Sequence, residues 1–278
     1  MKKHIKMKTK FIVLSKLLLK TRFLIKNSVD NVKIFSLINY NLFLVFCFLL
    51  AGCNYTSVRQ ASNYKEVLSG YTTMVLLPIE VEMKLIDTSN KLKRLHAYEH
   101  HLEELVKNNI IYAMKLKGIE LSFLSRKETY NKGIHNEVLR LRKKFNEKMS
   151  LINHDKLEIE NNAYLVDINF GIDPIQIGIA TNADTIMLAD FSGFSRTAGA
   201  MIQDFLWHTR KPIAGSKMSI SIIDVKSGKL LWNNYDFTQD EYFTFSSENK
   251  ATRDKIDNKI IKTYLNNILK DFCYRCDK

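Results

Sequence analysis

Residues 217–232, KMSISIIDVKSGKLLW, carry the clearest fold signal in the 278-residue chain. Apolar and polar residues alternate on both sides of Lys226-Ser227-Gly228, a pattern that indicates two half-buried strands joined by a turn. Gly228 suits a turn position that needs a positive φ, because glycine has no Cβ. The stretch therefore predicts a β-hairpin.

The segments before the hairpin predict further strands and helices. Thr73–Glu82 (TMVLLPIEVE) is expected to form a buried strand, in which Pro78 favours the exit or an edge because proline cannot donate to a ladder. Leu92–Leu116 has apolar residues at three- and four-residue spacing, so a helix is expected there, with Gly118 closing it. Ala163–Phe170 fits either a strand or a helix.

The remaining elements complete a layered arrangement. A strand is expected over Ile119–Leu124, followed by a capping box at Ser125–Glu128 and an amphipathic helix that runs on to Met149. A helix is expected next, with Asp173 as its N-cap and Pro174 after it, and then a strand over Asp184–Asp190 that runs into Phe191–Phe194. Two further helices are expected, one from about Arg196 to Trp207 and one over Arg253–Phe272. This order predicts an α/β fold, with α+β as the alternative, in which helices pack on a mixed sheet in three layers.

An apolar stretch precedes the fold signals. Residues 42–54 read LFLVFCFLLAGCN, and the ten apolar residues 42–51 fall short of the roughly 20 that a membrane-spanning helix needs, although they match the length of a signal-peptide core. Leu50-Ala51-Gly52-Cys53 resembles the lipobox of bacterial lipoproteins, which implies cleavage before Cys53 and lipids on that cysteine. A buried core helix ending in Gly-Cys is the alternative.

The leader also carries most of the chain's excess charge. The whole chain has a net charge of +13, whereas removal of residues 1–52, with ten Lys or Arg and the single acid Asp30, leaves 32 basic and 28 acidic residues and a net charge of +4. A nucleic-acid partner is therefore not expected. The forty residues before the apolar run have two explanations: translation that begins near Val32, which we favour, or a genuine long leader.

Cysteine usage fits an exported protein. After loss of Cys47 and lipidation of Cys53, only Cys273 and Cys276 remain, and a local disulfide between them is expected in an oxidising compartment. A redox or metal role is the alternative. It is disfavoured because the pair follows the carboxyl end of a predicted helix, where the dipole disfavours thiolate.

These observations predict three regions. Residues 1–52 form the leader and signal peptide, residues 53–70 (beginning CNYTSVRQ) form a polar, lipidated tether, and residues 71–278 form a single α/β domain.

Three segments of the predicted domain resemble a known family. The family is that of envelope lipoproteins related to the curli-secretion lipoprotein and the TolB amino-terminal domain. Its "V-x-x-L-P" strand resembles Thr72–Pro78, and its "A-D" strand resembles Ala183–Leu188. Its "D-x-x-T-G-x-x-L-W" hairpin resembles Ser221–Trp232, with Ser227 in place of the usual threonine. The match covers scattered parts of residues 71–237. It implies an α/β envelope domain with non-enzymatic work in secretion or assembly, and it carries over no catalytic residue.

His96-Ala97-Tyr98-Glu99-His100 is the sharpest chemical pattern, because H-x-x-E-H on a helix resembles the motif of inverted zinc peptidases. Those enzymes need a further glutamate downstream, and no glutamate occurs between Glu160 and Glu241. His101 and Glu103 could substitute only from different helix faces. A solvated polar helix face is expected here.

Gly193-Phe194-Ser195-Arg196-Thr197 lies between a predicted strand and helix, which is the context of a nucleophile elbow. Thr197 stands where the second glycine belongs, and His208, the nearest candidate base, lies only 13 residues after Ser195, so a helix-capping loop is expected instead.

A partner surface is expected near the helix that follows. Phe205, Leu206 and Trp207 are consecutive and cannot all face one way, so we expect an exposed surface that includes Phe194, Phe205 and Trp207.

The sequence thus predicts a non-enzymatic lipoprotein anchored through Cys53 at the periplasmic face of the outer membrane. Asn54, rather than aspartate, in the position after Cys53 favours the outer membrane by the sorting pattern of lipoproteins. The lipoprotein would act as a structural or accessory component in envelope assembly or secretion, through an envelope protein partner or as a homo-oligomer, without cofactor, metal or catalytic residue. The alternative is a periplasmic hydrolase, zinc-dependent through His96, Glu99 and His100 or built on Ser195.

Overall fold

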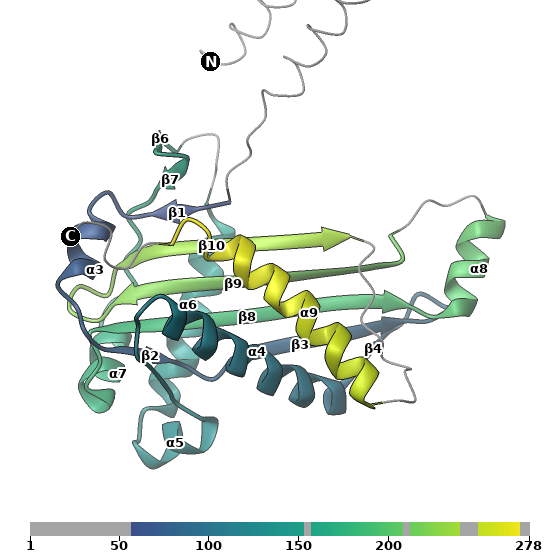
Figure 1. Cartoon of the computed structure of the whole chain (residues 1–278), viewed down its shortest axis with the longest axis horizontal. Coiled ribbons are helices and arrows are strands. Elements are labelled where there is room, and N and C mark those ends of the chain that lie inside the picture. The colour runs from purple at the N-terminus through teal and green to yellow at the C-terminus, as the bar shows by residue number, and fades with distance from the viewer. Residues whose placement is uncertain (1–56, 153–156, 208–211, 240–249, 273–278) are drawn as a thin grey trace, which may run out of the picture. The chain divides into compact units, whose positions relative to one another are not determined.

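A computed structural model describes residues 57–152, 157–207, 212–239 and 250–272. All of these residues belong to one compact unit, Thr56–Lys278. In these residues a ten-stranded mixed sheet has the order β4-β3-β8-β9-β10-β1-β7-β6, with β2 also beside β8 and β5 beside β2 (Figure 1). The expected α/β fold with a mixed sheet is confirmed.

The hairpin predicted from residues 217–232 forms the centre of this sheet. β9 (Ala214–Asp224) and β10 (Leu230–Gln239) are antiparallel, and β9 also pairs with β8 (Thr185–Arg196). Gly228 has a φ of 68°, and a Cβ there would lie 2.5 Å from the carbonyl oxygen of Gly171. The turn therefore requires glycine at this position. All three strands are longer than their apolar patterns indicate.

Pro78 divides the predicted strand over Thr73–Glu82 into two. β2 (Met74–Leu76) and β3 (Glu80–Ile86) both run parallel to β8, and the chain between them leaves the ladder. Proline has no N–H to donate, so the single strand predicted across this position is wrong. β5 (Leu121–Phe123) flanks β2, and β4 (Leu92–Arg94) flanks β3.

The described part of the expected tether is built into the domain. β1 (Arg59–Gln60) lies between β10 and β7 (Ala163–Leu165), with β6 (Ile159–Glu160) outside β7, and α3 (Tyr64–Ser69) follows β1. Leu68 on α3 is completely buried. The domain therefore includes residues 57–70, and the boundary expected at residue 71 is wrong because two-residue strands leave no readable period in a polar segment.

Helices cover both faces of the sheet, as the prediction of three layers requires. α4 (His96–Leu116) and α9 (Lys250–Ile268) cross one face (Figure 1), above a core that contains Trp232, Tyr264 and Phe191. α6 (His135–Ser150) and α7 (Asp173–Thr181) cover part of the other face, over Phe170, Ile177 and Leu188. No helix among the described residues combines the length and apolarity that a membrane span needs.

Helix boundaries differ from expectation where strands or glycines intervene. α4 begins at His96 because Leu92–Arg94 pairs with β3. The capping box of Ser125 and Glu128 is confirmed, but it starts the short helix α5 (Arg126–Asn131), and Gly133 at φ 69° separates α5 from α6. Ile172 is the N-cap of α7, so Asp173 and Pro174 lie one position further into the helix than predicted.

Candidate functional site

Helix α8 (Ala198–Leu206) has an exposed apolar end. Thr197 caps the helix by accepting a hydrogen bond from the backbone N–H of Ala200 at 3.2 Å, and Arg196 pairs with Asp204 at 2.7 Å. Phe205 and Trp207 are 79% and 74% exposed, and Ile202 and Leu206 are exposed beside them. Figure 1 shows α8 beyond the ends of β8 and β9.

Phe194 belongs to the sheet rather than to α8. It lies on β8, is half-buried, and its ring packs over Gly215 of β9, where an added Cβ would come within 2.8 Å of the ring. Of the three residues expected at a partner surface, Phe205 and Trp207 are therefore fully presented to solvent, and Phe194 is not.

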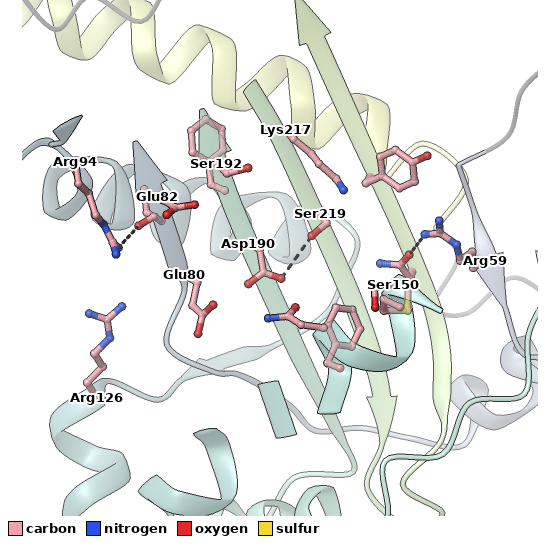
Figure 2. Close-up of a pocket in the computed structure, with 17 residues that line it drawn as sticks. Arg59, Glu80, Glu82, Arg94, Arg126, Ser150, Asp190, Ser192, Lys217 and Ser219 are labelled. Carbon is pink, nitrogen blue, oxygen red and sulfur yellow. Dashed lines mark hydrogen bonds between the residues drawn. The ribbon is translucent and has the colours of Figure 1, made fainter. Parts of the chain in front are cut away.

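A polar groove of about 760 Å³ lies on the sheet face beside the carboxyl end of α6. Its floor comes from β3, β8, β9 and β10, whose polar side chains at alternate positions follow one another across the sheet (Figure 2). The charged lining residues are Arg59, Glu80, Glu82, Arg94, Arg126, Asp190 and Lys217. Helices α6 and α7, whose apolar side chains pack on the sheet, thus cover only one end of this face.

Each carboxylate of the groove lies beside a cation. Asp190 accepts from Nη1 of the buried Arg142 at 2.6 Å, and Nε of the same guanidinium lies 3.4 Å from Glu80. Arg142 also donates to the carbonyl oxygen of Pro78. Glu82 pairs with Lys84 at 3.1 Å. The acidic side of the groove is therefore neutralised within the protein.

Two of the groove's arginines also serve the fold. Nε of Arg94 donates to Glu99 at 2.7 Å, and Nη2 of Arg126 donates to the carbonyl oxygen of Ile79 at 3.1 Å. Both lie at the β3 end of the groove (Figure 2).

The opposite end of the groove places two cations on one aromatic ring. Nη1 of Arg59 donates to Oδ1 of Asn233 at 2.7 Å, and its guanidinium carbon lies 5.2 Å from the centre of the Tyr235 ring. Nζ of Lys217 lies 4.7 Å from the same ring. Although Lys217 is exposed as a residue, burial of its ammonium and the nearby Arg59 lower the pKa of Lys217, and Asp190 opposes them.

The solvated helix face expected for His96, Glu99 and His100 is exposed at both histidines, whereas Glu99 makes structural contacts inside the protein. Glu99 is buried and accepts from the backbone N–H of Met83 at 3.0 Å and from Arg94, while His100 is exposed. Burial alone would raise the pKa of Glu99, but these hydrogen bonds, with His96 adding to them, outweigh it and hold the pKa below its usual range. Within the described ranges, no three His, Cys, Asp or Glu side chains form a metal-binding group.

Ser195 does not lie on a turn. It is the penultimate residue of β8, pairs with Ala214 and is buried, and the chain turns into α8 only at Thr197. The strand–turn–helix context of a nucleophile elbow is therefore wrong for this serine. His208, Cys53, Cys273 and Cys276 lie outside the described residues.

A polar cluster between α4 and α9 was not predicted. Asp257 is completely buried and accepts from the hydroxyl of Tyr98 at 2.6 Å, while Nε2 of His101 lies 3.1 Å from Asp254. Burial raises the pKa of Asp257 above its usual value. The sequence shows that Tyr98 and His101 lie three positions apart on one helix. It does not show their partners, which lie on another helix about 150 residues away along the chain.

These features define the described unit as a three-layer α/β domain with one partly open sheet face. No protein-family model and no curated protein matches the chain. Among solved structures it is similar to the PelC dodecamer from Paraburkholderia phytofirmans, with a TM-score of 0.35 and 10% identity over 80% of this chain and 98% of that one.

Two other similar structures are lipoprotein GNA1162 from Neisseria meningitidis and the LpoB C-terminal domain from Salmonella enterica. The first has a TM-score of 0.30 and 8% identity over 69% of this chain and 96% of that one. The second has a TM-score of 0.24 and 10% identity over 63% and 95%. At these scores the likenesses support no conclusion about function.

Proposed function

We propose that the chain is an envelope lipoprotein, held by lipids on Cys53 at the periplasmic face of the outer membrane, that works without catalysis by binding another envelope protein through the end of α8. The anchor rests on Leu50-Ala51-Gly52-Cys53 at the end of an apolar core. The observation that carries the binding role is the exposure of Phe205 and Trp207 on either side of the exposed Leu206.

Aromatic side chains of this size are enriched where proteins meet and supply much of the binding energy there. A group of large apolar side chains exposed together on one surface is typical of a site that a binding partner covers. The helix that carries them is fixed by Thr197 and by the Arg196–Asp204 ion pair, so little order would be lost on binding.

The non-enzymatic part of the proposal is supported by what the candidate catalytic residues do. Glu99 holds the start of α4 to Met83, and Ser195 is buried in a strand. No specific observation favours the hydrolase alternative.

The anchor is tested by intact mass and membrane fractionation of the chain expressed with its native leader, beside Cys53→Ala. We expect a lipidated wild type that begins at Cys53 and fractionates with the outer membrane, and an unlipidated variant. A full-length, unlipidated wild type would contradict the proposal.

The binding surface is tested by placing a photo-crosslinking amino acid at Phe205 in the native bacterium, with Tyr112, exposed on α4, as the matched control. We expect a protein adduct from position 205 only, identified by mass spectrometry and lost when Trp207→Ser is added. Adducts with lipid alone would assign α8 to the bilayer, and adducts with a second copy would assign it to self-assembly; either would refute the proposed partner.

A further inference from the structure

We propose that the outward face of α9 lies against anionic lipid headgroups of the membrane that holds the anchor. The inference rests on the proposed function in one respect, because the lipids on Cys53 bring the domain to a bilayer, and it does not depend on α8. Three observations carry it: a row of lysines on one side of the helix, carboxylates that face away from this row, and the polar residues around it.

One side of α9 carries the lysine row, which consists of Lys255, Lys259 and Lys262. The three residues are exposed, and their spacing of four and three positions places them on the same side of the helix. None of them forms an ion pair with any residue in the described ranges. The row extends about 10 Å along the helix axis. Charges spread along a line suit anionic groups spread over a plane better than a single bound ion.

The two carboxylates of α9 face away from the lysine row. Asp257 accepts a hydrogen bond from the hydroxyl of Tyr98 on α4, and Asp254 lies 3.1 Å from Nε2 of His101 on the same helix. The acids of α9 are therefore directed towards α4. The lysines are directed to solvent, and Figure 1 shows α9 as an outer layer on the sheet.

The neighbouring helix does not neutralise the lysine row. Each of the three carboxylates of α4 lies beside a cation of its own. These pairs are Glu99 with Arg94, Glu103 with Arg126, and Glu104 with Lys107. The row thus remains a positively charged part of the surface, to which an anionic partner would be attracted.

The surroundings of the row favour a membrane surface over a protein as that partner. Thr252, Thr263 and Asn266 are exposed on the same side of α9, and the large apolar side chains of the helix belong to the core. Protein interfaces derive most of their binding energy from buried aromatic and apolar side chains and are depleted in lysine. Lysines near an anionic bilayer are attracted to it without inserting into it.

The contact would fix the orientation of the domain. Because lipids on Cys53 would already supply affinity for the membrane, the lysine row would determine which side of the domain faces the bilayer. The layer of α4 and α9 would then face the headgroups, and the polar groove on the opposite face of the sheet would point away from them.

The test measures how fast single lysines react with an uncharged amine-acylating reagent, as read by mass spectrometry. The full chain is expressed with its native leader and reconstituted into phosphatidylcholine vesicles with or without phosphatidylglycerol. Lys143 is the matched control in the same molecule, because it lies on α6, which covers the opposite face of the sheet, and its side chain is 79% exposed. Flotation of the vesicles shows separately whether the protein is anchored.

We expect phosphatidylglycerol to slow the acylation of the lysine row roughly five- to tenfold. High salt should abolish this protection by screening, and Lys143 should react at the same rate throughout. Equal rates with and without phosphatidylglycerol, in a protein that floats with both kinds of vesicle, would overturn the inference and leave the anchor intact. Protection in native outer membranes but not in phosphatidylglycerol vesicles would assign the row to an acidic protein and refute the lipid.

Variants at the centre of the row make the assignment specific. Lys259→Gln should remove most of the protection of Lys255 and Lys262, and Lys259→Arg should keep it, because the attraction depends on charge. Lys143→Gln should leave the protection unchanged. Both substituted positions are exposed, so the fold is expected to be retained, which circular dichroism checks. Full protection in Lys259→Gln would refute the contact.

Discussion

Arg142 joins helix α6 to the sheet through three acceptors. Its guanidinium contacts Asp190, Glu80 and the carbonyl of Pro78, at the point where proline interrupts the ladder between β2 and β3. The side chain is buried, so each of its donors needs a partner inside the protein. One residue thus compensates the break that Pro78 introduces.

Arg142→Ala should lower the free energy of unfolding by about 2–3 kcal/mol, because it leaves Asp190 and a buried carbonyl without their donor. Lys143→Ala is the matched control: Lys143 is exposed on the same helix, and its 3.9 Å pair with Glu147 should contribute about 0.5 kcal/mol or less. Urea unfolding of both variants measures the difference. Equal losses would show that Arg142 is not a structural anchor.

Residue roles were predictable from the sequence only where the partner is local. The capping box pairs Ser125 with Glu128 three positions away, and its pattern is visible in the sequence. The helix pattern places Glu99 on a solvated face, whereas this carboxylate is buried and accepts from the backbone N–H of Met83 in another element. The Lys217–Tyr235–Arg59 cluster likewise requires the register of three strands, which no local pattern gives.

At the scale of elements, α4 and α9 meet through titratable groups as well as apolar ones. Tyr98 and His101 face Asp257 from α4, and Arg253 and Asp254 lie beside it on α9. Because burial raises the pKa of Asp257, the folded state holds a proton there at pH values where the unfolded chain has released it. This contact therefore weakens as the pH rises from about 4, the usual pKa of aspartate, through the folded-state pKa.

Asp257→Asn keeps an acceptor for the Tyr98 hydroxyl and removes the ionisable group. We expect its free energy of unfolding, relative to wild type, to increase with pH from about 4 and to level off above the folded-state pKa. Urea unfolding across this range measures the difference. A flat difference for Asp257→Asn would refute the buried proton.

Long periodic elements were predictable, and short ones were not. The hairpin and α9 have enough residues for their periods to be read. β4 and β7 have three residues each, and they become strands only because β3 and β1 offer them a ladder. Pairing with neighbouring strands, rather than intrinsic propensity, determines the secondary structure of such short segments.

For the whole molecule, the extent of the domain is set by burial rather than by polarity. Val58, Tyr64 and Leu68 belong to the core under α4 and α9, although they come from a segment whose polar composition predicts a tether. Its backbone also joins β7 and β6 to the rest of the sheet, because β1 pairs with β10 on one side and β7 on the other. Without β1, the strands β6 and β7 would lose their connection to the sheet.

A chain that begins at Ser57 should therefore fold cooperatively, and one that begins at Tyr71 should not. Burial of one large apolar side chain contributes about 2 kcal/mol, so loss of three removes about 6 kcal/mol from a total of typically 5–15 kcal/mol. The two truncated chains are compared by urea unfolding and circular dichroism. Leu68→Ala in the longer chain, expected to cost about 3 kcal/mol, separates lost packing from lost pairing of β1. Equal midpoints for the two truncated chains would show that residues 57–70 are only docked on a domain that is complete without them.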